Sequence, residues 1–153
     1  MKAMLITLIL LSSLFATEIK LIDQNASDPA YLLPLKKYPK WLCEGELENG
    51  KKTQFVSVKS MMQVFQHQEY FKKHKLLEDN IKKIYVQDYI SGRKVDARQA
   101  FYVFGSKIIG PHGDDLIPFE TKENAELFML KHGGTKILSF DKLSTGLIRY
   151  LDM

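Results

Sequence analysis

One order of predicted elements, strand, strand, helix, strand, occurs twice along the chain, and this repeat constrains the fold more than any other feature. In the first half, alternating residues 41–47 indicate a strand, and the Asn-Gly pair that follows favours a hairpin turn into a second strand at 53–58. A helix is expected to open at Ser57 or Lys59, with apolar residues at helical spacing: Met61, Met62, Phe65 and Phe71. Residues 81–86 are expected to form the third strand.

The second half shows the same order after a short helix-like stretch at 96–100. Strands are expected in three places: 101–104, 116–119 and 136–140. The helix between the last two strands is capped by Thr121 and ends at His132, which is followed by two glycines. The polar cap at one end and the glycines at the other are typical helix boundaries.

The repeat predicts an α+β fold of two similar ββαβ units packed together, after an N-terminal signal peptide. Aligning Lys59 with Lys122 also aligns Phe65 with Phe128, which supports a duplicated unit. A unit of about 50 residues is too small to be stable alone without staples, so the halves are expected to share a core. The predicted segments are a signal peptide (1–16), a lead-in with little regular structure (17–36), a first unit (37–90) and a second unit (91–153).

The first residues have the pattern of a secretory signal peptide. A short positive start is followed by an apolar and hydroxyl run at 4–15, which is shorter than the roughly 20 residues that span a bilayer. Cleavage is expected after Ala16, so the mature chain begins at Thr17. No cysteine follows the run closely, and we therefore expect export to the periplasm without a lipid anchor or other stable membrane anchor.

Composition and motifs narrow the classes of function. The 22 basic and 18 acidic residues give a net charge of +4, and the basic residues are scattered among acidic ones, which argues against a nucleic-acid surface. The nucleophile elbow, the phosphate-binding loop, the dinucleotide fingerprint and the paired-cysteine and paired-histidine metal motifs are all absent from the sequence. We therefore expect a binding protein and not an enzyme.

Five residues are candidate metal ligands, and each also has a structural interpretation: Cys43, Met61, Met62, His112 and His132. Cys43 shares the inward face of its predicted strand with Trp41 and Leu47, with Glu44 closer to solvent, so burial as a small hydrophobe is favoured. The methionines suit a core, and His132 suits a helix C-terminus. His112 lies at a loop tip between glycines, where a ligand role and a plain turn role are equally supported. Thiolate, thioether and imidazole are the donors that Cu(I) prefers.

The chain resembles the nitrous-oxide-reductase accessory protein family, NosL, over nearly the whole mature sequence. The resemblance is carried by upstream segments at 37–41 and 55–65 and by a series of short matches in the second half: Asp88-Tyr89, 96–103, Gly105-Ser106, 110–113, 117–119, Ala125, Phe128 and 132–134. It implies an exported protein of two ββαβ halves that acts as a Cu(I) chaperone for the copper centre of nitrous oxide reductase.

The chain departs from the family pattern at both metal-binding segments. Residues 31–35 (Tyr-Leu-Leu-Pro-Leu) stand where the family has Cys-Gly-Met, and His112 replaces the methionine of a Gly-Pro-Met-Gly loop. Only His112 matches a family ligand position, and Cys43 does not match the family's cysteine. From the resemblance as a whole we expect a copper chaperone that hands Cu(I) to an acceptor copper protein such as nitrous oxide reductase. The alternative is a metal-free interaction module of the same fold, and a homodimer is compatible with either.

Overall fold

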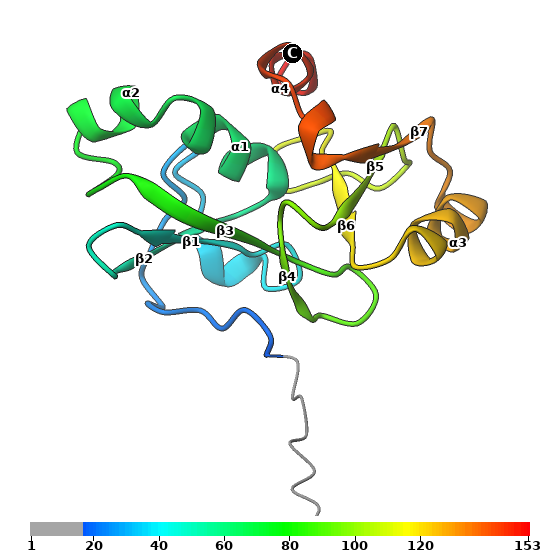
Figure 1. The fold of residues 1–153 in the computed structure, drawn as a ribbon, viewed down its shortest axis with the longest axis horizontal. Helices are drawn as coiled ribbons and strands as arrows, with labels where there is room; N and C mark the ends of the chain where they lie inside the picture. The colour runs from blue at the N-terminus through cyan, green and yellow to red at the C-terminus, as the bar shows by residue number, and fades with distance from the viewer. Residues whose placement is uncertain (1–16) are drawn as a thin grey trace, which may run out of the picture.

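The computed structural model describes residues 17–153, so the expected signal peptide lies outside the described residues. Two antiparallel sheets lie side by side, with helices α1, α2 and α4 along one side and α3 at the far end of the second sheet (Figure 1). No helix of the described part is long and apolar enough to cross a membrane. The elements in chain order are η1 (Leu35–Lys37), β1 (Cys43–Leu47), β2 (Lys52–Phe55), α1 (Val58–Gln66), α2 (Gln68–Lys73), β3 (Ile81–Gln87), β4 (Lys94–Asp96), β5 (Phe101–Phe104), β6 (Ile117–Phe119), α3 (Lys122–His132), β7 (Lys136–Ser139), η2 (Phe140–Lys142) and α4 (Thr145–Leu151).

The two sheets have related strand orders. The first sheet runs β2-β1-β3-β4 and the second runs β6-β5-β7, so β1 and β5 each lie between the two strands that follow them in their own half. Cys43 of β1 is paired with Phe55 of β2, and Phe101 of β5 is paired with Phe119 of β6. The predicted α+β class is confirmed, and the structure shows that its strands form two antiparallel sheets. Duplication of one unit stays a prediction.

One hydrophobic cluster joins the two sheets. Tyr102 of β5 packs in the same cluster as Cys43 and Ile84 of the first sheet, together with residues of α1 and α4. The neighbouring residue Val103 faces the other way and packs with Phe128 of α3 in a second cluster. The period-two alternation of β5 therefore places one face on the shared core and the other under α3.

The lead-in covers the outer face of the first sheet, and this overturns one expectation. Glu44 was expected near solvent, but only 3% of it is exposed. Beside it, the Gln54 side chain accepts a hydrogen bond from the Ile22 N–H (3.0 Å) and donates to the Lys20 carbonyl (2.7 Å). The Glu44 carboxylate is compensated by the ammonium groups of Lys94 at 2.6 Å and Lys52 at 3.2 Å. Burial alone would raise the pKa of Glu44, but the two lysines lower it below its ordinary value.

Trp41 also differs from the expectation. It precedes β1, which begins at Cys43, so the strand alternation does not extend back to it. Trp41 packs edge-on against Tyr89 beside the second cluster, while Cys43 and Leu47 lie together in the shared core. The expected common face therefore holds for Cys43 and Leu47 only.

Helix capping fixes how the two helices correspond. The Ser57 hydroxyl accepts from the Ser60 N–H at 3.3 Å, and the Thr121 hydroxyl accepts from the Asn124 N–H at 3.2 Å, as predicted for Thr121. Superposing the two caps pairs buried residues with buried residues, Met61 with Ala125 and Val64 with Phe128. The structural alignment is thus one residue away from the pairing of Lys59 with Lys122 made on the sequence.

Three elements differ from the sequence expectations. The first helix breaks at His67, whose φ of −130° ends α1 and begins α2. The helix-like stretch at 96–100 is instead the end of strand β4 and a turn, in which the Asp96 carboxylate accepts from the Arg98 N–H at 2.9 Å. Helix α4 near the C-terminus was not expected, although Ser144 caps it as serine commonly does.

Candidate metal centre

A narrow loop displays His112 at the surface. The loop is closed by a hydrogen bond from the Gly110 N–H to the Gly113 carbonyl at 2.8 Å, and Gly113 has a φ of +83° that favours glycine. A Cβ on Gly110 would come within 2.8 Å of the Asp115 side chain, so the loop also needs a glycine there. About half of the His112 side chain (49%) is exposed, which leaves the imidazole able to meet a ligand.

Two residues distant in sequence lie against the His112 ring. The Tyr31 ring stacks on it with centroids 4.0 Å apart and an interplanar angle of 11°. The Tyr31 hydroxyl donates to the Asp152 carboxylate at 2.8 Å, and the same Asp152 oxygen lies 3.7 Å from Nδ1 of His112. Burial, reinforced by the bond to Asp152, raises the pKa of Tyr31 well above its ordinary value, so the phenol keeps its proton.

A buried aspartate sets the position of Tyr31. The Asp28 carboxylate accepts from the backbone N–H of Ala30 (3.0 Å) and Tyr31 (2.7 Å), which closes a tight turn. Its other oxygen accepts from the Val56 N–H at 2.9 Å and from the Ser60 hydroxyl. The turn that carries Tyr31 is therefore tied to the end of β2 and to the start of α1.

Lys59 holds the opposite side of the site. Its side chain is fully buried, and its ammonium donates to the His112 carbonyl at 2.6 Å and to the Leu151 carbonyl at 3.1 Å. The same ammonium lies 3.7 Å from the Asp152 carboxylate and 5.4 Å from the centre of the Tyr31 ring. One cation from α1 thus fixes both the His112 loop and the end of α4.

Asp115 connects the same loop to the N-terminus of α1. Its carboxylate accepts from the Lys59 N–H at 2.9 Å and from the Leu116 N–H at 2.8 Å, while its second oxygen is buried without a hydrogen-bond partner in the described part of the chain. Burial raises the pKa of Asp115 from 3.8 to about 6, although these hydrogen bonds and the Lys59 charge act in the other direction.

The three sulfur-containing candidates lie together in the shared core and away from solvent. Cys43 and Met61 are 0% exposed and Met62 is 2% exposed. Burial raises the pKa of the Cys43 thiol well above its ordinary value, so it stays protonated, and a protonated thiol is not a metal ligand. The expected burial of Cys43 is confirmed.

His132 lies apart from the His112 site. It is in the last turn of α3, where its ring centroid is 4.8 Å from that of Phe128 and its carbonyl accepts from the Lys107 N–H at 3.0 Å. The structure therefore brings none of the other four candidates to His112. Within residues 17–153, no group of three or more histidine, cysteine, aspartate and glutamate side chains could hold a metal ion.

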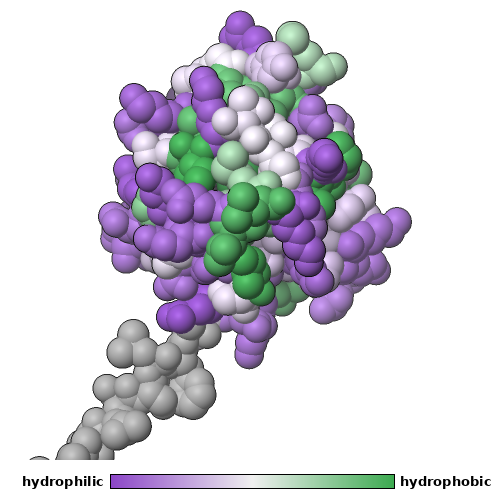
Figure 2. All heavy atoms as spheres, turned by 90° about the vertical axis from the view of Figure 1, so that its right-hand side faces the viewer, coloured by the Kyte–Doolittle hydropathy of each residue, from purple (hydrophilic) through white to green (hydrophobic). Residues whose placement is uncertain are grey.

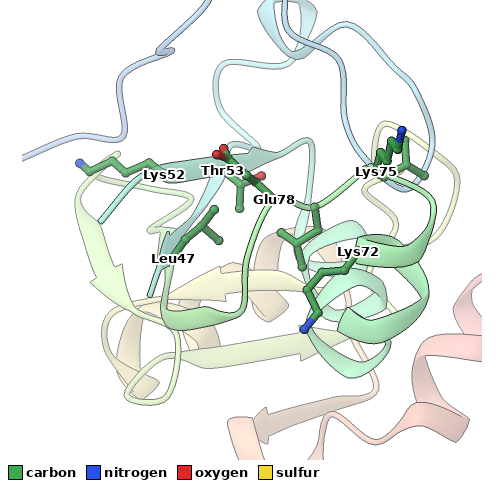
Figure 3. Close-up of a pocket in the computed structure, with 8 residues that line it drawn as sticks. Leu47, Lys52, Thr53, Lys72, Lys75 and Glu78 are labelled. Atoms are coloured by element: carbon green, nitrogen blue, oxygen red, sulfur yellow. The ribbon is translucent and has the colours of Figure 1, made fainter. Parts of the chain in front are cut away.

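Two other surface features carry no comparable chemistry. A cavity of about 560 Å³ lies between the β1-β2 hairpin and α2, but the amines of Lys52 and Lys72 point away from each other (Figure 3). These amines are already paired with Glu44 and Glu69. Figure 2 shows hydrophobic side chains among hydrophilic ones on the face that contains α3, where Leu127 and Leu130 are exposed.

Sequence reasoning identified His112 but missed the side chains that surround it. Asp152 is separated from its partner Tyr31 by 121 positions, and Lys59 from the His112 carbonyl by 53 positions. The sequence holds one signal for Lys59, because it lies in the first turn of a predicted helix between the apolar residues Val58 and Met61. Asp28 before a proline is likewise a typical turn residue.

Comparison with known proteins gives one family and two solved structures. The NosL family model matches residues 20–148. The crystal structure of the copper chaperone NosL from Shewanella denitrificans has a similar fold, with a TM-score of 0.69 and 22% identity over 84% of this chain and 97% of that chain. The solution structure of apo-NosL from Achromobacter cycloclastes gives a TM-score of 0.49 and 22% identity over 69% and 87% of the two chains.

The search among curated proteins finds no match. The match to the family model extends from the lead-in through both sheets to α4, so it covers far more than half of the chain. The chain therefore belongs to the NosL family, whose members are accessory proteins and chaperones and not enzymes.

Proposed function

We propose that this protein is an exported accessory protein that carries one copper ion at His112 and hands it to an acceptor copper protein. The observation that carries the proposal is the exposed His112 imidazole, held in a fixed orientation by Tyr31 and Lys59 in a NosL-family fold. The similarly folded protein from Shewanella denitrificans is a copper chaperone, which supports copper as the cargo.

Transfer would take place by ligand exchange. A site with few protein ligands leaves coordination positions that an incoming histidine or cysteine of the acceptor can fill before the ion leaves. His112 is exposed at a loop tip, so the acceptor can approach it directly. The acceptor belongs to the exported copper enzymes, and nitrous oxide reductase is the candidate that family membership supports.

Export depends on the first residues of the sequence. Residues 1–16 have the order of a cleavable signal peptide, and the mature chain would begin at Thr17 in the periplasm. The two sheets share one hydrophobic core, and a small protein of this kind would encounter its acceptor by diffusion.

A second candidate function, a metal-free interaction module, is supported by the placement of the sulfur donors. Cys43, Met61 and Met62 are at most 2% exposed, so none of the thiol and thioether groups expected to bind Cu(I) reaches the His112 surface. In that case the His112 loop and the stacked Tyr31 ring would form a contact surface for a protein partner.

Copper stoichiometry distinguishes the two functions. The mature chain, metal-free, is titrated with copper in each oxidation state against a chromophoric competitor, Cu(I) under anaerobic reducing conditions. We expect one copper per monomer and at least a tenfold loss of affinity in His112→Ala, with no loss in the matched control His74→Ala, an exposed histidine at the end of α2. No binding above that of free histidine in either state would leave the interaction module.

A further inference from the structure

We propose that Met153 supplies a thioether ligand to this site, and that one Cu(I) ion is held between the Met153 sulfur and the His112 imidazole. This inference rests on the proposed function, because it names the second ligand and the oxidation state of the cargo. Met153 is not among the five candidate ligands suggested by the sequence, and it directly follows Asp152 in the chain.

The exposure of Met153 distinguishes it from the other methionines of the described residues. Met153 is 94% exposed, whereas Met61 and Met62 are at most 2% exposed. Met129 is partly buried against the second cluster. A methionine usually fills a gap in a core, and Met153 fills none in the described part of the chain, so its sulfur is open to an incoming ion.

Lys59 brings the two ligand-bearing segments together. Its ammonium donates to the His112 carbonyl at 2.6 Å and to the Leu151 carbonyl at 3.1 Å, so these two oxygens lie at most roughly 6 Å apart. Leu151 is two positions before Met153, and the Met153 N–H donates to the Tyr150 carbonyl at 3.3 Å. The backbone from which the Met153 side chain extends is therefore held beside the His112 loop.

Asp152 supports this arrangement without binding the ion. One oxygen of its carboxylate accepts from the Tyr31 hydroxyl at 2.8 Å and lies 3.7 Å from the Lys59 ammonium. A carboxylate oxygen with a buried cation beside it is a poor ligand for a second cation, because the two cations repel each other. The same oxygen lies 3.7 Å from Nδ1 of His112, so Asp152 fixes the residue before Met153 next to the imidazole.

The distance that remains is within the reach of the methionine side chain. The Cα atoms of Met153 and Asp152 are about 3.8 Å apart, as in any trans peptide. Methionine is unbranched with three rotatable bonds, and at 94% exposure it can turn toward His112 without moving the core. A nitrogen and a sulfur that bind one ion at about 2.0 and 2.3 Å lie at most roughly 4 Å apart.

The chemistry of the two donors suits Cu(I). Thioether sulfur selects Cu(I), and imidazole also binds copper. Met153 thus supplies the soft donor that the buried Cys43, Met61 and Met62 cannot offer at this surface. Two protein ligands leave positions for the side chains of an acceptor, which fits transfer by ligand exchange.

The first experiment measures Cu(I) affinity of the mature chain anaerobically against a chromophoric chelator. Met153→Leu keeps the size of the side chain and removes the sulfur, so we expect at least a tenfold loss of affinity with an unchanged thermal unfolding temperature. The control Met129→Leu removes a sulfur from the second cluster and should stay within twofold of the wild type. Met153→Cys returns a sulfur donor and should bind Cu(I) at least as tightly as the wild type.

The second experiment observes the ligand directly. The mature chain has four methionines, and their ε-methyl groups give separate signals when labelled with carbon-13. One equivalent of Cu(I) should shift the Met153 signal and leave the signals of Met61 and Met62 in place. The shift should be lost in His112→Ala, because both residues bind the same ion.

The outcomes separate this inference from the proposed function. Cu(I) binding that His112→Ala weakens and Met153→Leu does not, with the Met153 signal unmoved, overturns this inference and leaves the proposed function standing. Losses that add fully in the double variant would place the two residues at separate ions and overturn it as well. Absence of Cu(I) binding by the wild-type mature chain overturns both.

Discussion

Two hairpins, one that precedes β1 and one that joins β3 to β4, have the same hydrogen bonds but different surroundings. In the first, the Asp28 N–H donates to the Leu33 carbonyl, and the Leu32 N–H donates to the Asp28 carbonyl. In the second, Asp88 makes the equivalent bonds with Arg93 and Gly92. The flanking pairs also correspond, since Ser27 is paired with Pro34 and Gln87 with Lys94.

Each hairpin also contains a buried aspartate, Asp28 in the first and Asp88 in the second, and the two make corresponding hydrogen bonds. Asp28 accepts from the residues two and three positions ahead and from Val56, which directly follows β2. Asp88 accepts from Ile90 and Ser91 and from Glu120, which directly follows β6. One carboxylate thus ties the first hairpin to the end of β2, and another ties the second hairpin to the end of β6 in the neighbouring sheet.

The difference lies in what each hairpin meets. The first presents Tyr31 to His112 and Asp152, which come from the second sheet's loop and the C-terminus. The second presents Ser91, which bonds within its own hairpin. Similar scaffolds therefore make different contacts, because only the first hairpin faces the segments that bear an imidazole and a carboxylate.

The largest expected effect on stability comes from replacing the two hairpin aspartates, Asp28 and Asp88, one at a time. Asp28→Ala leaves the buried Val56 N–H and Ser60 hydroxyl without a partner and should cost roughly 3–5 kcal/mol in the free energy of unfolding. Asp88→Ala removes bonds that are only partly buried and should cost roughly 1–3 kcal/mol. Urea unfolding followed by far-UV circular dichroism measures both.

The same variants separate stability from the site. Asp28→Ala also releases the Tyr31 backbone and should weaken copper binding, whereas Asp88→Ala should leave it unchanged. Where Asp28→Ala does not fold, the milder Asp28→Asn keeps one acceptor oxygen and gives the same comparison. Equal losses of stability and of copper affinity in the two hairpins would show that they are equivalent after all.

The parts of the fold that depend on neighbouring residues could be predicted from the sequence. The Asn-Gly turn between β1 and β2, the Thr121 cap and the glycine-flanked His112 loop are local patterns, and each lies where it was expected. The burial of Glu44 could not be predicted, because it depends on the lead-in that covers the sheet and on Lys94, which comes from another strand.

The site shows the same limit. His112 could be identified because its loop needs glycines on both sides and nothing local needs an imidazole. The contacts to Tyr31, Lys59 and Asp152 join segments that are distant in the sequence, so no local pattern indicates them. A lysine in a helix is normally interpreted as a surface residue, because lysine is rarely buried without a partner.

The two helix N-termini give a second comparison, with a smaller effect. Asp115 lies buried at the start of α1, whereas the corresponding turn of α3 carries the exposed Glu123. Because the folded-state pKa of Asp115 is raised to about 6, the folded state binds the proton more tightly than the unfolded chain. The free energy of unfolding should therefore fall as the pH rises from 4 to 6, by roughly 2–3 kcal/mol for this group.

Asp115→Asn tests the sign of this pH dependence. The amide keeps one acceptor oxygen for the Lys59 and Leu116 N–H groups and does not ionise. Between pH 4 and pH 7, the free energy of unfolding of the variant should rise by roughly 2 kcal/mol relative to that of the wild type, as measured by urea unfolding. Glu123→Gln on α3 is the matched control and should show no such gain, and a gain of the same size there would contradict the assignment to Asp115.

The smallest effect comes from the residue that follows Tyr31. Leu32 has a φ of +56° where the second hairpin has Gly92 at +76°, and a non-glycine residue in this region costs roughly 1–2 kcal/mol. Leu32 is 66% exposed, so Leu32→Gly loses little burial and, after the entropy cost of glycine, should stabilise the protein by roughly 0.5 kcal/mol. At Gly92 an added Cβ would lie 3.6 Å from Glu18, an ordinary van der Waals contact, so the reciprocal Gly92→Ala should destabilise by roughly 1 kcal/mol through its backbone conformation alone. Opposite signs in thermal unfolding would show that the hairpins share one backbone conformation, whereas a loss of stability in both would mean that Leu32 contributes packing that its exposure does not indicate.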